Sequence, residues 1–279
     1  MESPEVDQAL AATMSVASDL GLSVDNATVV QNSNRLAVRL VPCEVLARGA
    51  APVRRNHEVA AFELEMARRF EQTDSPVGVL KPRVEPRVYL RDGFAITLWK
   101  HYEPVPVGDI ATAEYARALE HLHAGMRRVD ADAPHFTDRV NEAETIVRDR
   151  SRSPELSDAD RILLANSLRS LRRDIVERSA DEQLLHGEPH GGNLLKTPSG
   201  LRFIDLETCC YGPVEFDIAH APDEVGDHYA LANRLLLRDC RLLVLAMVAA
   251  WRADRDDELP NRREMLERLL SELRLSGGW

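Results

Sequence analysis

The sequence lacks the features of membrane-spanning proteins and of secreted proteins. No part of the 279 residues approaches the roughly 20 consecutive apolar residues of a membrane-spanning helix. The acidic start, Met1-Glu2-Ser3-Pro4-Glu5, lacks the basic and apolar regions of a signal peptide. We therefore expect a cytoplasmic protein with no membrane partner.

Cysteine is scarce and shows no pattern. The four cysteines are Cys43, Cys209, Cys210 and Cys240, and they lack the paired spacing that is typical of metal ligands. The adjacent Cys209 and Cys210 would make a poor disulfide framework. We expect all four to be reduced thiols.

Lysine is scarce as well, and acidic residues outnumber basic ones. The formal net charge is −11, and Lys81, Lys100 and Lys196 are the only lysines. Because nucleic acid binding needs clustered positive charge, we expect no nucleic acid partner. The negative charge favours a cationic ligand, and the alternative is that it only keeps the protein in solution.

The first hundred residues combine several strand patterns with two helical ones. A helix is expected from Ser3, which is followed by a proline, to the glycine at position 21. Asn32-Ser33-Asn34 forms either a turn that covers phosphates or a plain hairpin turn. Strands are expected at 27–30, 36–40, 44–48, 77–80, 87–90 and 94–99, with a second helix at 57–72.

Helical patterns dominate after Pro104 and Pro106, which interrupt the preceding pattern. We predict an α+β protein with two lobes, a small antiparallel-sheet lobe with a leading helix at 1–103 and a mainly helical lobe at 104–279. Ligand sites favour clefts between such lobes. Helices are expected at 110–128, 136–150, 157–179, 228–253 and 261–275, and short strands at 184–185 and 201–204.

The stretch His186–Leu195 carries residue types suited to phosphoryl transfer. That reaction needs a group to orient the attacking hydroxyl, oxygen ligands for Mg²⁺ and positive charge near the phosphates. Glu188 would take the base position, while Asn193, five residues later, and Asp205 would hold Mg²⁺ through oxygen. The alternatives are that Asn193 is a turn residue and that Asp205 and Glu207 only end a strand and cap a helix.

This segment resembles the catalytic loop and metal-binding motif of the aminoglycoside phosphotransferase-like kinases, which include choline kinase-like proteins and have the protein kinase fold. Their pattern is His-Gly-Asp, a His two residues onward, an Asn, an Ile-Asp strand end and Gly-x-x-x-x-Asp. The matching positions here are His186-Gly187-Glu188, His190, Asn193, Ile204-Asp205 and Gly212 to Asp217.

The resemblance implies transfer of the γ-phosphate of ATP or GTP, with Mg²⁺, to a hydroxyl of a small polar acceptor. It implies that His186 supports the loop geometry and that Asp217 holds the loop backbone through hydrogen bonds. His190 and Glu207 are further candidates, and residues 98–102 would lie beside the adenine. A cationic acceptor would suit the charge of the chain, but the acceptor and the oligomeric state are not predicted.

The resemblance also implies a phosphate-contacting residue on the third strand, paired with a glutamate on the following helix. The matching residues are Arg48 and Glu63, with Glu65 as a second choice. The alternatives are that Arg48 is an ordinary edge-strand charge and that Glu63 is only solvated.

Two positions depart from the family pattern, since Arg48 replaces the usual lysine and Glu188 the usual aspartate. Arginine can hold phosphate oxygens through its planar fork, although it differs from lysine in reach and shape. A misplacement of about 1 Å at the base can cost roughly 100-fold in rate. The second hypothesis is therefore a nucleotide-binding regulatory protein that has lost catalysis. A metal-dependent hydrolase is disfavoured, because only His186 and His190 lie close in sequence.

Overall fold

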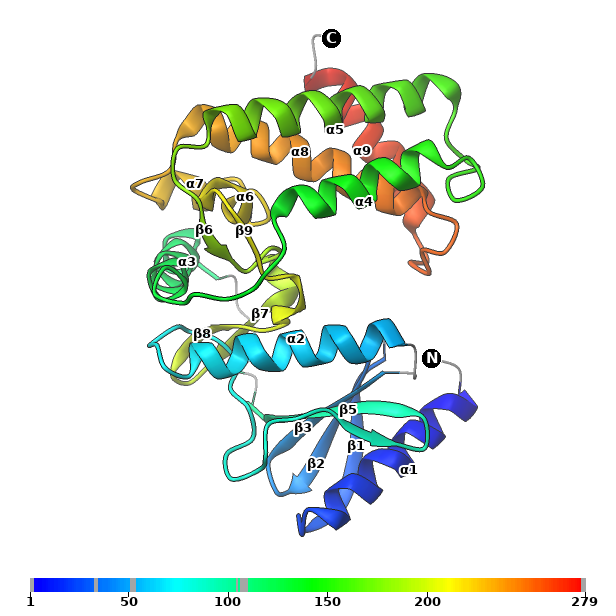
Figure 1. Ribbon diagram of the computed structural model, residues 1–279, viewed down its shortest axis with the longest axis vertical. Coiled ribbons are helices and arrows are strands. Elements are labelled where there is room, and N and C mark those ends of the chain that lie inside the picture. The colour runs from blue at the N-terminus through cyan, green and yellow to red at the C-terminus, as the bar shows by residue number, and fades with distance from the viewer. Residues whose placement is uncertain (1–2, 33–34, 51–53, 104, 106–109, 277–279) are drawn as a thin grey trace. The chain divides into compact units, whose positions relative to one another are not determined.

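The computed structural model describes residues 3–32, 35–50, 54–103, 105 and 110–276 (Figure 1). The chain forms two compact units, which are not continuous in sequence. The first comprises residues 1–110, 124–129 and 192–208, and the second comprises 111–123, 130–191 and 209–279. The predicted lobes divide the chain at a single point and stay a prediction. Of the expected turn at Asn32-Ser33-Asn34, the last two residues lie outside the described ones.

The first unit is built on an antiparallel sheet with the strand order β1-β2-β3-β5-β4. The expected opening helix is present as α1, and the expected second helix as α2. The elements are α1 (Ser3–Asp19), β1 (Val24–Asn32), β2 (Leu36–Pro42), β3 (Val45–Ala50), α2 (Arg54–Phe70), β4 (Tyr89–Arg91) and β5 (Phe94–Lys100).

One face of this sheet packs against α1. Leu36, Val38 and Leu40 of β2 share a buried core with Ala12 and Val16 of α1. Successive side chains of a strand point to opposite faces, so the residues between these leucines and valines face the other way. That opposite face carries Ala37 and Arg48, which are directly paired between β2 and β3.

A second, two-stranded element completes the first unit. It consists of β7 (Leu194–Thr197) and β8 (Gly200–Phe203). The strand expected at 77–80 is wrong, because only single bridges join Val77 to Phe203 and Leu80 to Trp99. The segment is bounded by prolines at positions 76 and 82, which cannot donate to a strand ladder, and this limits the pairing.

The second unit is mainly helical. The helix expected at 228–253 begins only at Arg234, because Asn233 caps it by accepting hydrogen bonds from the amides of Leu235 and Leu236. The remaining elements of the chain are α3 (Thr112–Met126), α4 (Phe136–Arg148), α5 (Asp158–Arg178), β6 (Gln183–Leu185), η1 (Gly191–Asn193), η2 (Leu206–Thr208), β9 (Cys210–Gly212), α6 (Val214–Ile218), α7 (Val225–His228), α8 (Arg234–Ala253) and α9 (Arg262–Ser276). The predicted α+β class is confirmed.

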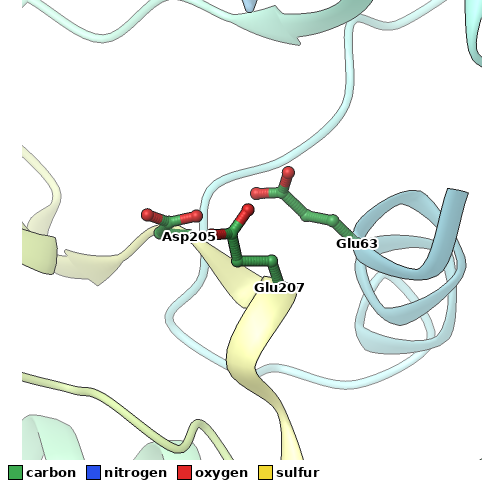
Figure 2. Close-up of side chains that lie close together, drawn as sticks. All are labelled: Glu63, Asp205 and Glu207. Atoms are coloured by element: carbon green, nitrogen blue, oxygen red, sulfur yellow. The ribbon is translucent and has the colours of Figure 1, made fainter. Parts of the chain in front are cut away.

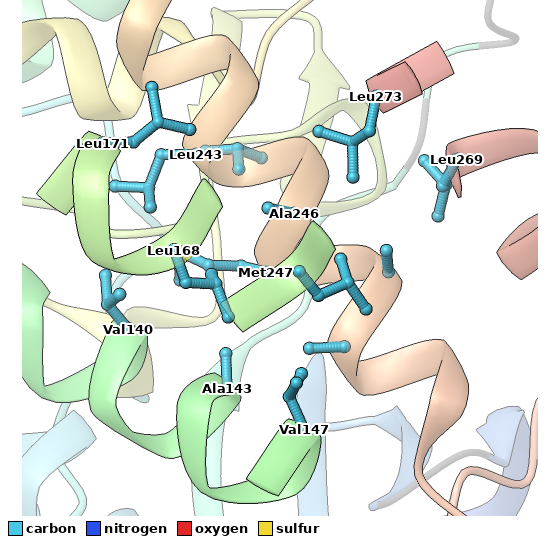
Figure 3. Packing of buried hydrophobic residues seen from close by; sticks show 14 of the residues in the cluster. Val140, Ala143, Val147, Leu168, Leu171, Leu243, Ala246, Met247, Leu269 and Leu273 are labelled. Carbon is cyan, nitrogen blue, oxygen red and sulfur yellow. The ribbon is translucent and has the colours of Figure 1, made fainter. Parts of the chain in front are cut away.

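The core of the second unit lies among α4, α5, α8 and α9 (Figure 3). Val140 of α4, Leu168 of α5, Leu243 of α8 and Leu269 of α9 all belong to one buried cluster. This packing supports the ends of α4 and α8, which carry residues of the candidate site. All four cysteines are free, as expected. Among the described residues, no helix has both the length and the apolar character needed to cross a membrane.

Candidate functional site

A cavity of about 330 Å³ lies within the first unit, and its volume is typical of a small-molecule site. Part of its lining is apolar and includes Leu46 and Ile204. Residues 99–102, which the resemblance places beside the adenine, also line it. The ionisable and amide side chains that line it with them include Arg35, Arg48, Glu63, Asn193, Asp205 and Glu207.

The predicted pair of Arg48 and Glu63 is present in this cavity. Arg48 donates one hydrogen bond from Nη1 to Glu63 Oε1 and another from Nη2 to Asp205 Oδ1, the latter at 3.0 Å. Glu63 is fully buried, because it lies on the same face of α2 as Ala60 and Ala67, which are also buried. The second choice, Glu65, is instead partly exposed and pairs with Arg69 on the same helix.

Sequence reasoning missed Arg35. Its Nη1 donates to Glu63 Oε2 at 2.6 Å, and its Nη2 forms an ion pair with Glu207 Oε2. A signal for this residue was available in the strand alternation. Arg35 is two positions before Ala37, which shares a sheet face with Arg48, so alternation places both arginines on one side of the sheet.

Three carboxylates converge between these arginines. Figure 2 shows the side chains of Glu63, Asp205 and Glu207 close together, and one oxygen atom of each carboxylate lies within 4.8 Å of an oxygen atom of the other two. Burial raises the pKa of Glu207 to about 7, and the negative charge of Asp205 adds to this effect, while Arg35 opposes it. Burial lowers the pKa of Arg48, but Glu63 and Asp205 outweigh this and hold it above its usual range. Arg48 therefore stays charged.

Glu207 is expected to make the free energy of unfolding fall as the pH rises from about 5 to 7.5. The folded protein keeps a proton on Glu207 until the pH approaches its pKa of about 7, whereas an unfolded glutamate has a pKa of about 4.3 and has lost the proton. Glu207→Gln removes this titration. The free energy of unfolding of the variant should therefore fall by about 1–3 kcal/mol less than that of the wild type between pH 5 and 7.5. Urea unfolding in EDTA at both pH values measures the difference. The exposed Glu71→Gln serves as control, and an equal pH dependence of Glu207→Gln and wild type would contradict the expectation.

Asn193 and Asp205, the predicted Mg²⁺ ligands, lie near each other in the first unit. The carbonyl of Asn193 accepts a hydrogen bond from the amide of Ile204 at 2.9 Å, and Asp205 follows directly. Asp205 has a φ of 70°, in the left-handed region that aspartate tolerates better than most residues. Such strained positions cluster at functional sites. Carboxylate and amide oxygens are the ligands that Mg²⁺ prefers, so this donor set fits the ion.

In the second unit, Asp217 holds the loop that begins at His186. Asp217 is fully buried, and its Oδ2 and Oδ1 accept hydrogen bonds from the amides of His186 and Gly187, each at 2.8 Å. His123 Nε2 lies 2.9 Å from Asp217 Oδ2, and His123 Nδ1 lies 2.9 Å from the hydroxyl of Tyr229. Burial raises the pKa of Asp217, but the hydrogen bond and charge of His123 outweigh this and hold it below its usual range. The part that Asp217 plays in the activity stays a prediction.

His186 and His190 differ in their surroundings. His186 is fully buried, and its Nδ1 accepts a hydrogen bond from the amide of Glu188 at 3.4 Å. His190 is exposed, and its amide donates to the carbonyl of Glu188 at 2.8 Å. The burial of His186 agrees with a structural part in the loop, whereas the role of His190 stays a prediction.

The predicted base, Glu188, forms an ion pair that sequence reasoning missed. Its Oε1 accepts a hydrogen bond from Arg139 Nη2, and the guanidinium of Arg139 lies 5.1 Å from the ring centroid of Trp251. Only 22% of the Glu188 side chain is exposed. Nothing in the sequence pairs residues on α4, α8 and the loop, so no local signal could have found this contact. The longer glutamate side chain brings its carboxylate to Arg139.

The predicted site residues thus fall into two groups. Arg48, Glu63, Asn193, Asp205 and Glu207 lie in the first unit and line one cavity. Glu188, His186, His190 and Asp217 lie in the second unit. The joint action of Glu188 with Asn193 and Asp205 stays a prediction.

Solved structures share the fold of this chain. An amicoumacin kinase, hAmiN, in complex with AMP-PNP, Ca²⁺ and Ami has a TM-score of 0.72 and 13% identity, with 98% of this chain and 96% of that chain covered. The choline kinase LicA from Streptococcus pneumoniae has a TM-score of 0.68 and 12% identity, with 94% and 99% covered. The GDP and kanamycin complex of APH(2")-IIIa has a TM-score of 0.68 and 12% identity, with 96% and 98% covered. The predicted kinase-like fold is confirmed.

The sequence itself also matches a family model. No curated protein matches the chain. The model of the phosphotransferase enzyme family, APH, matches residues 19–233, which is more than half of the sequence. The chain therefore belongs to the phosphotransferase enzyme family.

Proposed function

We propose that the protein transfers the γ-phosphate of ATP or GTP to a hydroxyl group of a small polar molecule. The observation that carries the proposal is the lining of one cavity in the first unit. That cavity combines residues 99–102, the cation Arg48 and the oxygen donors Asn193 and Asp205. Phosphoryl transfer from a nucleotide needs a surface for the nucleobase, positive charge near the phosphates and ligands for the metal ion in such a site.

In this proposal, Arg48 contacts the phosphates while Glu63 fixes its guanidinium. The planar fork of arginine suits two phosphate oxygens, and its remaining N–H groups can stay with the carboxylates. Asn193 and Asp205 hold Mg²⁺, which neutralises phosphate charge when it is bound. The cavity walls and residues 99–102 hold the nucleobase.

Glu188 orients the acceptor hydroxyl and takes its proton as the oxygen attacks the γ-phosphate. The nucleoside diphosphate leaves with the electrons of the broken P–O bond. Arg139 limits the orientations of the Glu188 carboxylate, and Asp217 limits those of the loop backbone. A base held in this way loses less entropy when the acceptor binds.

The names of the similar structures support a nucleotide and a small acceptor, since they include kinases of amicoumacin and choline and a complex with GDP and kanamycin. Asp223 and Asp227, two acidic residues before α8, form ion pairs with Arg241 and Arg234. These pairs weaken the case that the two aspartates recognise a cation. We therefore propose a small hydroxylated acceptor and leave its charge open.

Calorimetric titration with ATP and with GTP, each with and without Mg²⁺, tests the proposal. We expect Mg²⁺-dependent binding that Asp205→Ala abolishes, because the variant loses a carboxylate ligand of the ion. Asp25→Ala, on the exposed edge of β1, is the matched control and should bind as the wild type does. No binding at millimolar nucleotide would contradict the proposal.

A second candidate is a nucleotide-binding protein with impaired catalysis. It is favoured by the ion pairs at the two positions that depart from the family pattern, Arg48 with Asp205 and Glu188 with Arg139. The double variant Arg48→Lys, Glu188→Asp separates the candidates when ATP consumption is measured with a panel of hydroxylated compounds. Activity that appears only in the double variant would favour impaired catalysis.

A further inference from the structure

We infer that Arg35 is a second phosphate-contacting cation, which makes the cavity prefer nucleotides with a polyphosphate chain over the nucleoside. This inference rests on the proposed function and adds a binding residue to it. Arg35 and Arg48 line the same cavity and bind the same carboxylate, that of Glu63.

The two arginines are arranged almost symmetrically about Glu63. Arg35 donates to its Oε2 and Arg48 to its Oε1. The side chain of Glu63 is 0% exposed, whereas those of Arg35 and Arg48 are 13% and 18% exposed. Both guanidinium groups are therefore shielded from bulk water but reach the cavity surface, where their attraction to an anion is stronger than in water.

Both guanidinium groups share the carboxylate of Glu63, and each also has a second carboxylate partner. The other partners are Glu207 for Arg35 and Asp205 for Arg48. Carboxylates that are engaged with a bound cation are weaker partners for arginine, so phosphate oxygens become the favoured anions for both guanidinium groups.

The sequence before Arg35 gives a reason for a second arginine. In protein kinases a glycine-rich loop covers the phosphates, and in nucleotide-binding loops backbone N–H groups bind them. Between β1 and β2 this chain has Ser33 and Asn34 and no glycine, and Arg35 follows at once. A charged side chain at this position supplies donors that a glycine-rich loop would provide from its backbone.

The competing explanation is that Arg35 only balances the charges of Glu63 and Glu207. The two explanations differ in what a double variant does. If Arg35 only pairs with the carboxyl groups around it, Arg35→Met combined with Glu207→Gln should restore nucleotide binding, since both partners of one pair are changed together. If Arg35 contacts phosphate, the double variant should remain as weak as the single one.

The experiment is calorimetric titration of the full chain with ATP and Mg²⁺, and separately with adenosine. We expect Arg35→Met to weaken ATP binding by about 10- to 100-fold, as the loss of a charge-assisted hydrogen bond predicts, and to leave adenosine binding within about 2-fold. The ATP affinity of Arg35→Lys should lie between those of Arg35→Met and the wild type, because lysine keeps the charge but lacks the planar guanidinium fork. Arg39→Met is the matched control, since Arg39 lies on the same face of β2 and pairs with Glu103 at 2.8 Å outside the cavity lining.

Three results would overturn the inference. The first is ATP binding by Arg35→Met that equals the wild type, and the second is full recovery of ATP binding in the double variant. The third is an equal loss of ATP and adenosine binding, because it would point to a distorted cavity. Circular dichroism checks the fold, and the double variant serves if Arg35→Met does not fold. A wild type that binds neither compound would instead contradict the proposed function, and the inference with it.

Discussion

Asp217→Ala is expected to lower the free energy of unfolding by about 3–5 kcal/mol, because it removes one partner of a buried, hydrogen-bonded charge group. Asp217 is fully buried and accepts hydrogen bonds from the amides of His186 and Gly187 and from the ring of His123. Alanine leaves these donors without an acceptor inside the protein. Urea unfolding at pH 7 measures the loss.

The pH dependence identifies the cause of this loss. The pKa of Asp217 is lowered in the folded protein, so its contribution to stability is present above the unfolded pKa, about 3.9, and is lost as the pH falls through the folded value. The difference between wild type and variant should therefore shrink below about pH 4. Asp223→Ala, at an 82% exposed side chain in the same unit, should change stability by less than about 0.5 kcal/mol. An equal effect of both variants would contradict the expectation, and Asp217→Asn, which keeps the size, replaces Asp217→Ala if the latter does not fold.

Glu188→Gln is expected to reduce phosphate transfer by about 100- to 10,000-fold, the usual contribution of a positioned general base. Glutamine keeps the length of the side chain but cannot take a proton from the acceptor hydroxyl. It also loses the ion pair with Arg139, so the orientation of the group is less fixed. ATP consumption is measured with an accepted hydroxylated compound, or with water as acceptor if a screen finds none.

Nucleotide affinity separates this effect from a damaged site. The residues proposed to contact nucleotide lie in the first unit, so Glu188→Gln should bind ATP within about 3-fold of the wild type. Glu182→Gln, at a partly exposed glutamate of the second unit that lies 3.2 Å from His135, is the matched control and should retain the full rate. A Glu188→Gln rate equal to that of the wild type would reject Glu188 as the general base.

Much of the secondary structure could be predicted because the local patterns are strong. The alternation of Leu36, Val38 and Leu40 predicts the strand that faces α1, and the proline after Ser3 marks the start of that helix. The strand expected at 77–80 failed, since its apolar residues suit a strand but its flanking prolines prevent a ladder. The late start of α8 after Asn233 was missed because an N-cap is set by one side chain next to a longer apolar pattern.

A motif fixes the spacing of Glu188, Asn193 and Asp205, so the sequence alone could nominate these residues, and their roles stay predictions. The pairing of Arg48 with Glu63 also followed from the family resemblance, and the structure contains it. Arg35 and Arg139 were missed because their partners are distant in sequence and belong to no motif. Contacts of this kind depend on which helix faces and strand ends meet after folding, which periodicity alone does not specify.

The discontinuity of the first unit limits how the protein can be dissected. A fragment that ends near Ile110 would contain the whole sheet, Arg48 and Glu63, but it would lack Asn193 and Asp205, which belong to the segment 192–208. Such a truncated chain would leave the carboxylate partner of Arg48 on the missing piece. The residues that line the cavity therefore come from widely separated stretches of sequence. A contiguous fragment that contains the whole first unit must span residues 1–208.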